Sequence, residues 1–182
     1  MVKIKKNDPN RACSRCIAIN ENSGKQCGRR TCMSQYCWQH LKIKKGLKID
    51  DSKLPNAGLG LFAVKKRKRS RDPVFEKNDK IDTYVGKVLN DRQTKKSNSP
   101  YIAALKKNHN IDARKTNSCA ARYINDARNT PRNVPRSRYN TDWTNNRKRI
   151  GVKAIRNISN NDELLLDYGS DYWKPEKKKK KK

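Results

Sequence analysis

No stretch of this 182-residue sequence approaches the roughly 20 apolar residues that a membrane-spanning helix needs. The basic first six residues are not followed by an apolar segment, so we expect no secretory signal and no membrane partner. A chain without these features is expected to lie in a reducing, intracellular compartment. Clustered cysteines in such a compartment are more often metal ligands than disulfides.

Acidic residues are scarce. Asp and Glu number 17 against 46 Lys and Arg, which gives a formal net charge of +29, and the mean hydropathy is −1.17. Two runs concentrate the positive charge: residues 65–71 contain six basic residues, and residues 177–182 are a lysine tail. Such a field favours a polyanionic partner such as nucleic acid, chromatin or an anionic surface, although a solubilising shell of lysines would give the same composition.

Composition divides the chain into three zones. Residues 1–49 hold five of the six cysteines and one of the two histidines. Residues 50–174 carry most of the aromatic and β-branched residues, and we expect them to form one compact domain. Residues 175–182 are expected to be a disordered poly-Lys tail, because like charges repel and no apolar residue anchors them.

The sequence also lacks a convincing helical period longer than two turns, and it has no internal repeat. Three segments instead mix β-branched and apolar residues over the length of a strand, namely residues 59–64, 81–89 and 150–155. Asn and Pro predict loops at residues 129–135, and Asn predicts another at residues 144–146. The expected fold class is mainly β, built from short, twisted sheets.

The N-terminal zone predicts a small zinc-binding module. Its spacing, from Cys13 to His40, is C-x2-C-x10-C-x4-C-x4-C-x2-H. Four N or S ligands suit tetrahedral zinc, and binding would fold a segment that has little apolar material. The predicted ligands, which resemble small Cys3His modules of large DNA-virus proteins, are Cys16, Cys27, Cys37 and His40. Cys13 and Cys32 are reserves for these positions, and a structural or docking role is expected.

Residues 58–63, with the sequence GLGLFA, match a dinucleotide-binding fingerprint letter for letter. The context contradicts that interpretation, because a Rossmann motif follows a buried strand and opens a helix. Here a polar stretch precedes the motif and the basic run follows it. The two glycines therefore have another explanation.

Four segments, taken together and in order, resemble SET-domain protein-lysine methyltransferases. They are residues 54–63 with the Gly-x-Gly turn, residues 84–86 (YVG), residues 111–125 with DARKTN and ARYIN, and residues 154–169 ending in DELLLDYG. The resemblance covers residues 54–173. It implies a SET domain with a knot-like C-terminal crossing, S-adenosylmethionine as cofactor, and methyl transfer to lysine side chains of a protein, expected to be a histone or chromatin-associated.

The resemblance also assigns roles to residues. Tyr168 is the expected catalytic tyrosine, and Tyr84 is expected to wall the substrate channel and orient the amine. The expected cofactor contacts are Gly58, Leu59, Gly60, Arg122, Asn125, Asp126 and Trp173. The expected channel residues are Tyr84, Leu166, Tyr168 and Tyr172.

Three departures from the family pattern bear on these roles. Asp126 stands where the family has His after Asn125. No Cys-x-Cys-x4-Cys follows Gly169, and the aromatic pair at residues 172–173 could instead cap the adenine and close the channel, or simply pack in the core. Leu166 replaces the family's usual Phe or Tyr, and the apolar space it leaves predicts that di- or trimethylation is possible.

The chemistry of the reaction explains why the sequence needs no strong base. Only a neutral amine attacks a sulfonium methyl group, and neutralising a lysine with a pKa of about 10.4 at a pH of about 7.4 costs about 4 kcal/mol. A desolvated channel and the nearby sulfonium both lower that pKa. Neither histidine is needed as a base, since His40 is an expected zinc ligand and His109 lies in a polar loop.

Two other functions fit parts of the sequence. The charge also fits a basic nucleic-acid- or chromatin-binding protein with an inactive SET-like domain, or a scaffold that uses the zinc module alone. Retention of Tyr84, Asn125 and Tyr168 favours the enzyme. The expected partners are a histone tail and nucleosomal or other DNA, bound through the basic runs. The expected location is a host-cell nucleus or a virion, and residues 65–71 could equally serve nuclear import.

Overall fold

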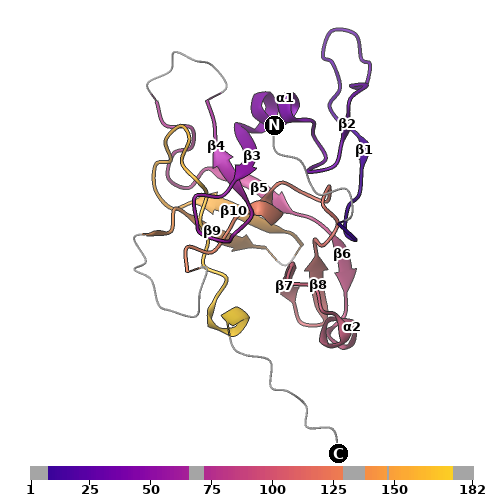
Figure 1. The fold of residues 1–182 in the computed structure, drawn as a ribbon, viewed down its shortest axis with the longest axis vertical. Helices are drawn as coiled ribbons and strands as arrows, with labels where there is room; N and C mark the ends of the chain where they lie inside the picture. Colours follow the sequence, from indigo (N-terminus) through magenta and orange to yellow (C-terminus); the bar gives the residue numbers. More distant parts are fainter. Residues whose placement is uncertain (1–7, 66–71, 129–137, 147, 174–182) are drawn as a thin grey trace, which may run out of the picture.

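The computed structural model describes residues 8–65, 72–128, 138–146 and 148–173 (Figure 1). The predicted loop at residues 129–135, the predicted lysine tail and most of the basic run at residues 65–71 lie outside this part of the chain. Among the described residues, no helix is both long enough and apolar enough to cross a membrane.

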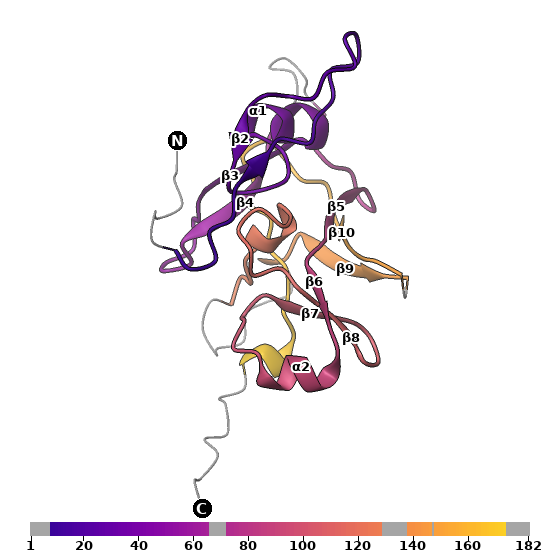
Figure 2. The same cartoon turned by 90° about the vertical axis from the view of Figure 1, so that its right-hand side faces the viewer.

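The N-terminal zone forms a small module at one end of the molecule, opposite helix α2 (Asp91–Lys96) (Figures 1 and 2). Strands β1 (Ser14–Arg15) and β2 (Arg30–Thr31) pair antiparallel, and helix α1 (Trp38–His40) runs into the π-helical turn η1 (Leu41–Lys45). Gly46 ends this turn with φ of 67°, a conformation that glycine adopts without strain. The chain then enters β3 (Leu47–Asp51), which spans the predicted boundary after residue 49.

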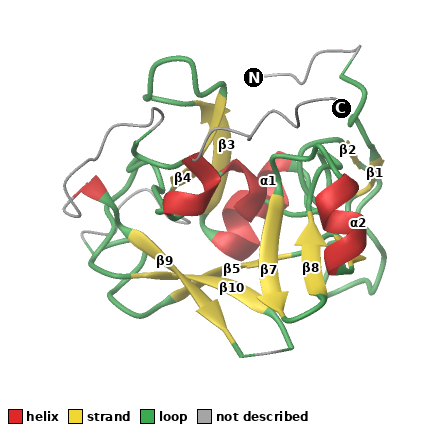
Figure 3. Cartoon of the chain, turned by 90° about the horizontal axis from the view of Figure 1, so that it is seen from below, coloured by secondary structure: helices red, strands yellow, loops and turns green. Residues whose placement is uncertain are grey.

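The remaining strands form one two-stranded and two three-stranded sheets, so the prediction of a mainly β fold with short sheets is confirmed. β3 pairs with β4 (Leu59–Ala63). One three-stranded sheet has the order β5 (Lys80–Tyr84), β10 (Ile150–Ala154), β9 (Thr141–Asn145). The other has the order β6 (Lys87–Leu89), β8 (His109–Asp112), β7 (Ile102–Lys106). Seen from below, the strands of these two sheets run in different directions (Figure 3).

Two predicted elements differ from the structure. Residues 81–89 form two strands in different sheets, because the chain turns at Gly86, where a Cβ atom would overlap the backbone of Asp112. The loop predicted at residues 144–146 is wrong for Thr144 and Asn145, which continue β9. Their pairing with Gly151 and Ile150 overrides the local preference of Asn for turns.

The C-terminal segment passes between parts of the chain that are far apart in sequence. The N–H of Leu164 donates to the carbonyl of Leu61 in β4, and the N–H of Leu166 donates to the carbonyl of Asn125. Asn140 holds the same segment from another side, since its side chain donates to Glu163 O and accepts from Leu165 N. Leu164 and Leu166 are fully buried in the central core.

Gly60 is required because the space a side chain would occupy is filled. A Cβ atom there would overlap the carboxylate of Glu163 and lie 3.2 Å from Cα of Ser52. Glu163 cannot easily move, because it accepts hydrogen bonds from Ser52 Oγ (2.6 Å) and Lys53 N (2.7 Å).

Substituting Gly60→Ala is therefore expected to lower the free energy of unfolding by about 1–3 kcal/mol, the usual cost of overpacking. Denaturant unfolding followed by circular dichroism measures this change. Gly28→Ala is the matched control, because no atom lies within 4 Å of the position a Cβ would take there. Equal stability of the two variants would contradict the explanation.

Candidate active site

A cavity of about 1190 Å³ lies where several parts of the chain meet. Most of its walls come from the turn between β3 and β4, from Tyr84 and residues 100–104, from residues 121–126, and from Tyr168 with residues 172–173. Residues 8–9, Thr116, Trp143, Asn145 and Ile150 complete the lining. Residues 121–126 begin with the 3₁₀ helix η2 (Ala121–Tyr123), and residues 172–173 end the 3₁₀ helix η4 (Ser170–Trp173). The cavity brings together most of the predicted site residues.

Tyr168 is fixed in this cavity by its backbone and by its hydroxyl. The hydroxyl donates to the carbonyl of Ile124 at 2.6 Å, and the backbone N–H donates to Asp126 Oδ2 at 3.0 Å. Burial raises the pKa of Tyr168 well above its usual value, so the phenol stays protonated at neutral pH. Because its proton is committed to a carbonyl, the hydroxyl oxygen can still accept a hydrogen bond from a ligand.

Tyr84 is held in the same way on another wall. Its hydroxyl donates to the carbonyl of Tyr101 at 3.0 Å, and its ring meets the ring of Trp143 edge-on, with the centroids 5.5 Å apart. Burial raises the pKa of Tyr84 above its usual value as well. Both predicted tyrosines therefore present neutral hydroxyls whose orientation is set by backbone carbonyls.

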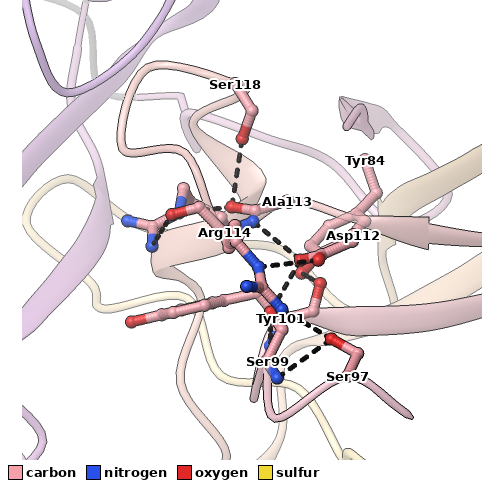
Figure 4. A network of polar contacts seen from close by, with 9 residues as sticks. Tyr84, Ser97, Ser99, Tyr101, Asp112, Ala113, Arg114 and Ser118 are labelled. Atoms are coloured by element: carbon pink, nitrogen blue, oxygen red, sulfur yellow. Dashed lines mark hydrogen bonds and ion pairs between the residues drawn. The ribbon is translucent and has the colours of Figure 1, made fainter. Parts of the chain in front are cut away.

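A polar network behind Tyr84 fixes the carbonyl that it contacts (Figure 4). Asp112 accepts from Ser99 Oγ at 2.6 Å and from Arg114 Nε at 2.8 Å, and Arg114 also donates to Ser97 Oγ. These bonds tie residues 97–101 to the end of β8. The Tyr101 carbonyl also accepts from Ala113 N at 2.9 Å, so its position is doubly determined.

Arg122 forms part of the cavity wall but is itself buried. Its guanidinium donates to the carbonyls of Ala113 (2.8 Å) and Arg114 (3.2 Å). Its central carbon lies 4.0 Å from the ring centroid of Tyr101 and 4.6 Å from that of Tyr123. Stacking between two aromatic rings compensates the buried charge and makes Arg122 an organising residue of this wall.

Asn125 connects the wall to β4. Its side-chain N–H₂ donates to the carbonyl of Leu59 at 3.0 Å and to Glu163 Oε1 at 3.3 Å. Asn125, Gly58 and Leu59 line the cavity, whereas Gly60 does not, because its free side faces Glu163. The two glycines thus have different roles: Gly58 adopts φ of 70° at the turn, and Gly60 makes room for a carboxylate.

Comparison with known proteins identifies the family. The SET-domain family model matches residues 58–169, which is more than half of the chain. This chain belongs to the SET-domain family. The tyrosines of the cavity, Tyr84 and Tyr168, both fall within the matched region.

Solved SET structures share the fold. The methyltransferase domain of human PR domain-containing protein 2 aligns with a TM-score of 0.53 and 21% identity, over 72% of this chain and 82% of that domain. A chain of ctPRC2, in an autoinhibited conformation bound to S-adenosylmethionine, aligns with the same TM-score and identity. That alignment covers 72% of this chain but only 16% of the ctPRC2 chain. No curated protein sequence matches this chain.

The cavity fits the cofactor that the SET family implies. Its volume exceeds the usual 300–1,000 Å³ of a ligand pocket, which leaves room for S-adenosylmethionine together with a lysine side chain. Among its described lining residues the charged ones are Asp8, Asp51, Asp126 and Arg122. An excess of acidic groups in a chain of net charge +29 suits the positive sulfonium and a lysine substrate.

Of the other two predicted channel residues, one lines the cavity and the other does not. Tyr172 lines the cavity and packs edge-on against Tyr168, with the ring centroids 4.7 Å apart. Leu166 is 1% exposed in the core and is not part of the lining. Trp143 and Tyr101 line the cavity, although the sequence analysis did not select them. The sequence around Trp143, TDWTN, contains one apolar residue and no alternating pattern, so it gave no local signal for this position.

The N-terminal module gathers the four predicted metal ligands. The ligand atoms of Cys16, Cys27, Cys37 and His40 all lie within 4.8 Å of one another. Nδ1 of His40 lies 3.5 Å from Sγ of Cys16 and 3.3 Å from Sγ of Cys37. Two ligand atoms of a tetrahedral zinc site lie ~3.5–3.8 Å apart, as follows from the usual Zn–N and Zn–S bond lengths. The Cys37 N–H also donates to Sγ of Cys16, which stabilises a thiolate there.

The two reserve cysteines are bonded to each other rather than free to bind a metal. Cys13 and Cys32 form a disulfide, so neither is available as a metal ligand. The expectation that this cluster contains metal ligands rather than disulfides is therefore wrong for this pair. The backbone pairing of β1 with β2 brings residues 14 and 31 together, and this places the neighbouring cysteines side by side.

Proposed function

We propose that this SET-domain protein transfers methyl groups from S-adenosylmethionine to lysine side chains of another protein. The observation that carries the proposal is that two neutral tyrosine hydroxyls, of buried Tyr84 and half-buried Tyr168, line one cavity and are each oriented by a backbone carbonyl. Bound S-adenosylmethionine would supply a methyl group on a positive sulfonium. Gly58, Leu59, Asn125 and Trp173 are the residues proposed to hold it.

The tyrosines would position the lysine amine rather than deprotonate it. Their raised pKa values leave no phenolate at neutral pH to act as a base. The hydroxyl oxygens of Tyr84 and Tyr168 can accept hydrogen bonds from the amine and hold its lone pair in line with the methyl group. The amine would lose its proton to solvent before attack, which is favoured by desolvation in the channel.

The proposed substrate is a histone tail or another lysine-rich, chromatin-associated protein, in a host-cell nucleus or a virion. The net charge of +29 would repel an isolated basic peptide at long range. DNA could bridge enzyme and substrate, because phosphates would contact the basic runs at residues 65–71 and 177–182. The acidic lining of the cavity would then attract the lysine at short range.

The test uses labelled S-adenosylmethionine with free histones, nucleosomes and the protein alone, and identifies methyl-lysine by mass spectrometry. Transfer to lysine is the expected result, with nucleosomes methylated faster and with a stronger salt dependence than free histones. Retention on DNA without binding of the cofactor or transfer would instead support the basic binding protein with an inactive SET domain. Equal rates and equal salt dependence for both substrates would contradict the bridging role of DNA.

The number of methyl groups added is expected to depend on Trp143 rather than directly on Leu166. Trp143 is half-buried in the cavity beside Tyr84, whereas Leu166 is enclosed by the core. Trp143→Ala removes a large ring from the channel and should increase the trimethyl-to-monomethyl product ratio by about ten-fold, the effect of roughly 1.4 kcal/mol in a product preference.

Time-resolved mass spectrometry of the product measures this ratio. Leu166→Met, which changes the core with little change in volume, is the control and should leave the ratio unchanged. Monomethyl product alone from the unchanged protein, at long times with excess enzyme, would contradict the prediction that di- or trimethylation is possible. An unchanged ratio in Trp143→Ala would contradict the role of Trp143.

A further inference from the structure

Asp126 joins the last part of the described chain to the cavity wall. Its carboxylate is 2% exposed and accepts four hydrogen bonds. Oδ1 accepts from Tyr139 Oη (2.8 Å) and Arg128 N (2.7 Å). Oδ2 accepts from Tyr168 N (3.0 Å) and Trp173 Nε1 (2.9 Å). One side chain therefore contacts both the backbone of the proposed catalytic tyrosine and the indole of a cavity residue.

Only a carboxylate satisfies these four donors. A carboxamide has one acceptor atom, so its N–H₂ would face a backbone N–H in either orientation. An imidazole has at most one acceptor nitrogen and would leave at least two backbone or indole N–H groups without a partner. Buried donors without partners cost about 1–3 kcal/mol each, so the residue that the family has at this place would not fit here.

Three side chains contact Trp173. Asp126 binds its N–H, the edge-on ring of Tyr172 packs with its centroid 5.2 Å away, and the guanidinium carbon of Arg128 lies 6.0 Å from its ring centroid. Arg128 in turn donates to Asp167 Oδ1 at 3.2 Å. The 3₁₀ helix η4 therefore contacts the cavity wall through these side chains. No cysteine follows Tyr168 in the sequence.

We propose that Asp126 is a positioning residue that fastens Trp173 as the closing wall of the cofactor cavity and, through the same oxygen, sets the backbone of Tyr168. The proposal rests on the proposed methyltransferase function. Asp126 acts through Trp173 and Tyr168, so its loss has two separable effects. Freeing Trp173 weakens cofactor binding, and shifting Tyr168 slows transfer.

Two variants separate these effects. Trp173→Phe keeps an aromatic ring and removes only the donor, so KM for S-adenosylmethionine should rise about ten-fold while kcat stays nearly constant. Asp126→Ala, which removes both acceptor oxygens, should raise KM by a similar factor and also lower kcat, because the backbone N–H of Tyr168 loses its acceptor. The two substitutions remove the same hydrogen bond between Asp126 and Trp173, so the double variant should bind cofactor no more weakly than Asp126→Ala alone.

Binding of the product S-adenosylhomocysteine, measured by calorimetry, gives the affinity without turnover. Asp126→His should also weaken binding, although it restores the usual family residue, because an imidazole leaves at least two of the N–H donors without an acceptor. Glu76→Gln is the control for loss of a carboxylate, because Glu76 is exposed and does not line the cavity. Unchanged affinity in the Asp126 variants, an equal loss in Glu76→Gln, or additive losses in the double variant would overturn the proposal.

An NMR measurement keeps this test independent of the enzymatic function. In the ¹⁵N-tryptophan-labelled full chain, Trp173→Phe identifies the Trp173 indole N–H signal by its disappearance. Asp126→Ala should move that signal upfield and speed its exchange with solvent, while the indole signals of Trp38 and Trp143 stay in place. No change in the Trp173 signal would overturn the fastening role. An unchanged protein that neither binds S-adenosylhomocysteine nor transfers methyl would instead refute the proposed function, whatever the NMR result.

Discussion

Tyr168→Phe is expected to lower the rate of methyl transfer by about 10²–10³-fold, the usual cost of losing one oriented polar group at a reacting centre. The substitution removes only the hydroxyl that Ile124 orients, and the ring should still pack against Tyr172. Affinity for S-adenosylhomocysteine should change less than three-fold, because the backbone contact with Asp126 does not involve the hydroxyl. The loss should therefore appear in kcat.

The pH profile adds a second measurement to this prediction. The pKa of Tyr168 is raised by burial, so its hydroxyl keeps its proton throughout the range in which a lysine amine becomes neutral. Log(kcat/KM) of the unchanged protein should rise with pH as the substrate lysine deprotonates, without a fall from ionisation of Tyr168. Tyr168→Phe should show the same slope at a lower rate, since the tyrosine is not the base.

Tyr36→Phe is the control for loss of a tyrosine hydroxyl, because Tyr36 lies in the N-terminal module and does not line the cofactor cavity. It should keep nearly full activity. Two results would contradict the catalytic role of Tyr168: near-normal transfer by Tyr168→Phe, or a loss of S-adenosylhomocysteine affinity large enough to explain the whole loss of rate.

Removing the metal is expected to have the largest effect on folding. We propose that Cys16, Cys27, Cys37 and His40 bind one zinc ion per chain, which is consistent with their convergence. Structural zinc sites contribute about 10–16 kcal/mol of apparent binding free energy in small modules. Chelation, or Cys37→Ser, should therefore unfold the module, whose own apolar cluster is small.

Metal analysis of the purified chain and circular dichroism with and without chelator measure this effect. Cys119→Ala is the matched control. Cys119 is a buried free cysteine outside the cluster, and burial raises the pKa of its thiol to about 11. The Cys119→Ala variant should keep the full zinc content, whereas Cys37→Ser should lose the zinc. A chain that contains no zinc, or that keeps its spectrum unchanged in chelator, would contradict the proposal.

Loss of the module should also affect the cavity. The Thr116 hydroxyl accepts from Ala12 N at 3.0 Å, and the backbone N–H of Thr116 donates to the carbonyl of Asn10. Asp8 lies two residues before Asn10. Asp8 and Thr116 both line the cavity. Leu41 and Leu47 also belong to the central core. The two parts of the chain are therefore joined by hydrogen bonds and by apolar packing.

The sequence predicted the family, the mainly β fold and the four Cys and His side chains that lie together in the N-terminal module. Each of these depends on residue type and on spacing over short segments. Closely spaced thiol and imidazole side chains suit a metal site whatever the surrounding fold. The ordered motifs around Tyr84, Asn125 and Tyr168 indicate the family from the sequence alone. The strand at residues 59–64 was predictable for the same reason, because its apolar pattern is local.

Only the tertiary structure decided which side chains face the cavity. Leu166 and Tyr168 are two residues apart, yet one fills the core and the other lines the site. Gly60 faces Glu163 across a separation of about a hundred residues, and Asp126 meets Trp173 across 47. Such contacts depend on how distant segments cross and on the register of each strand, which local preferences do not specify. The sequence determined what chemistry is present, and packing determined where it acts.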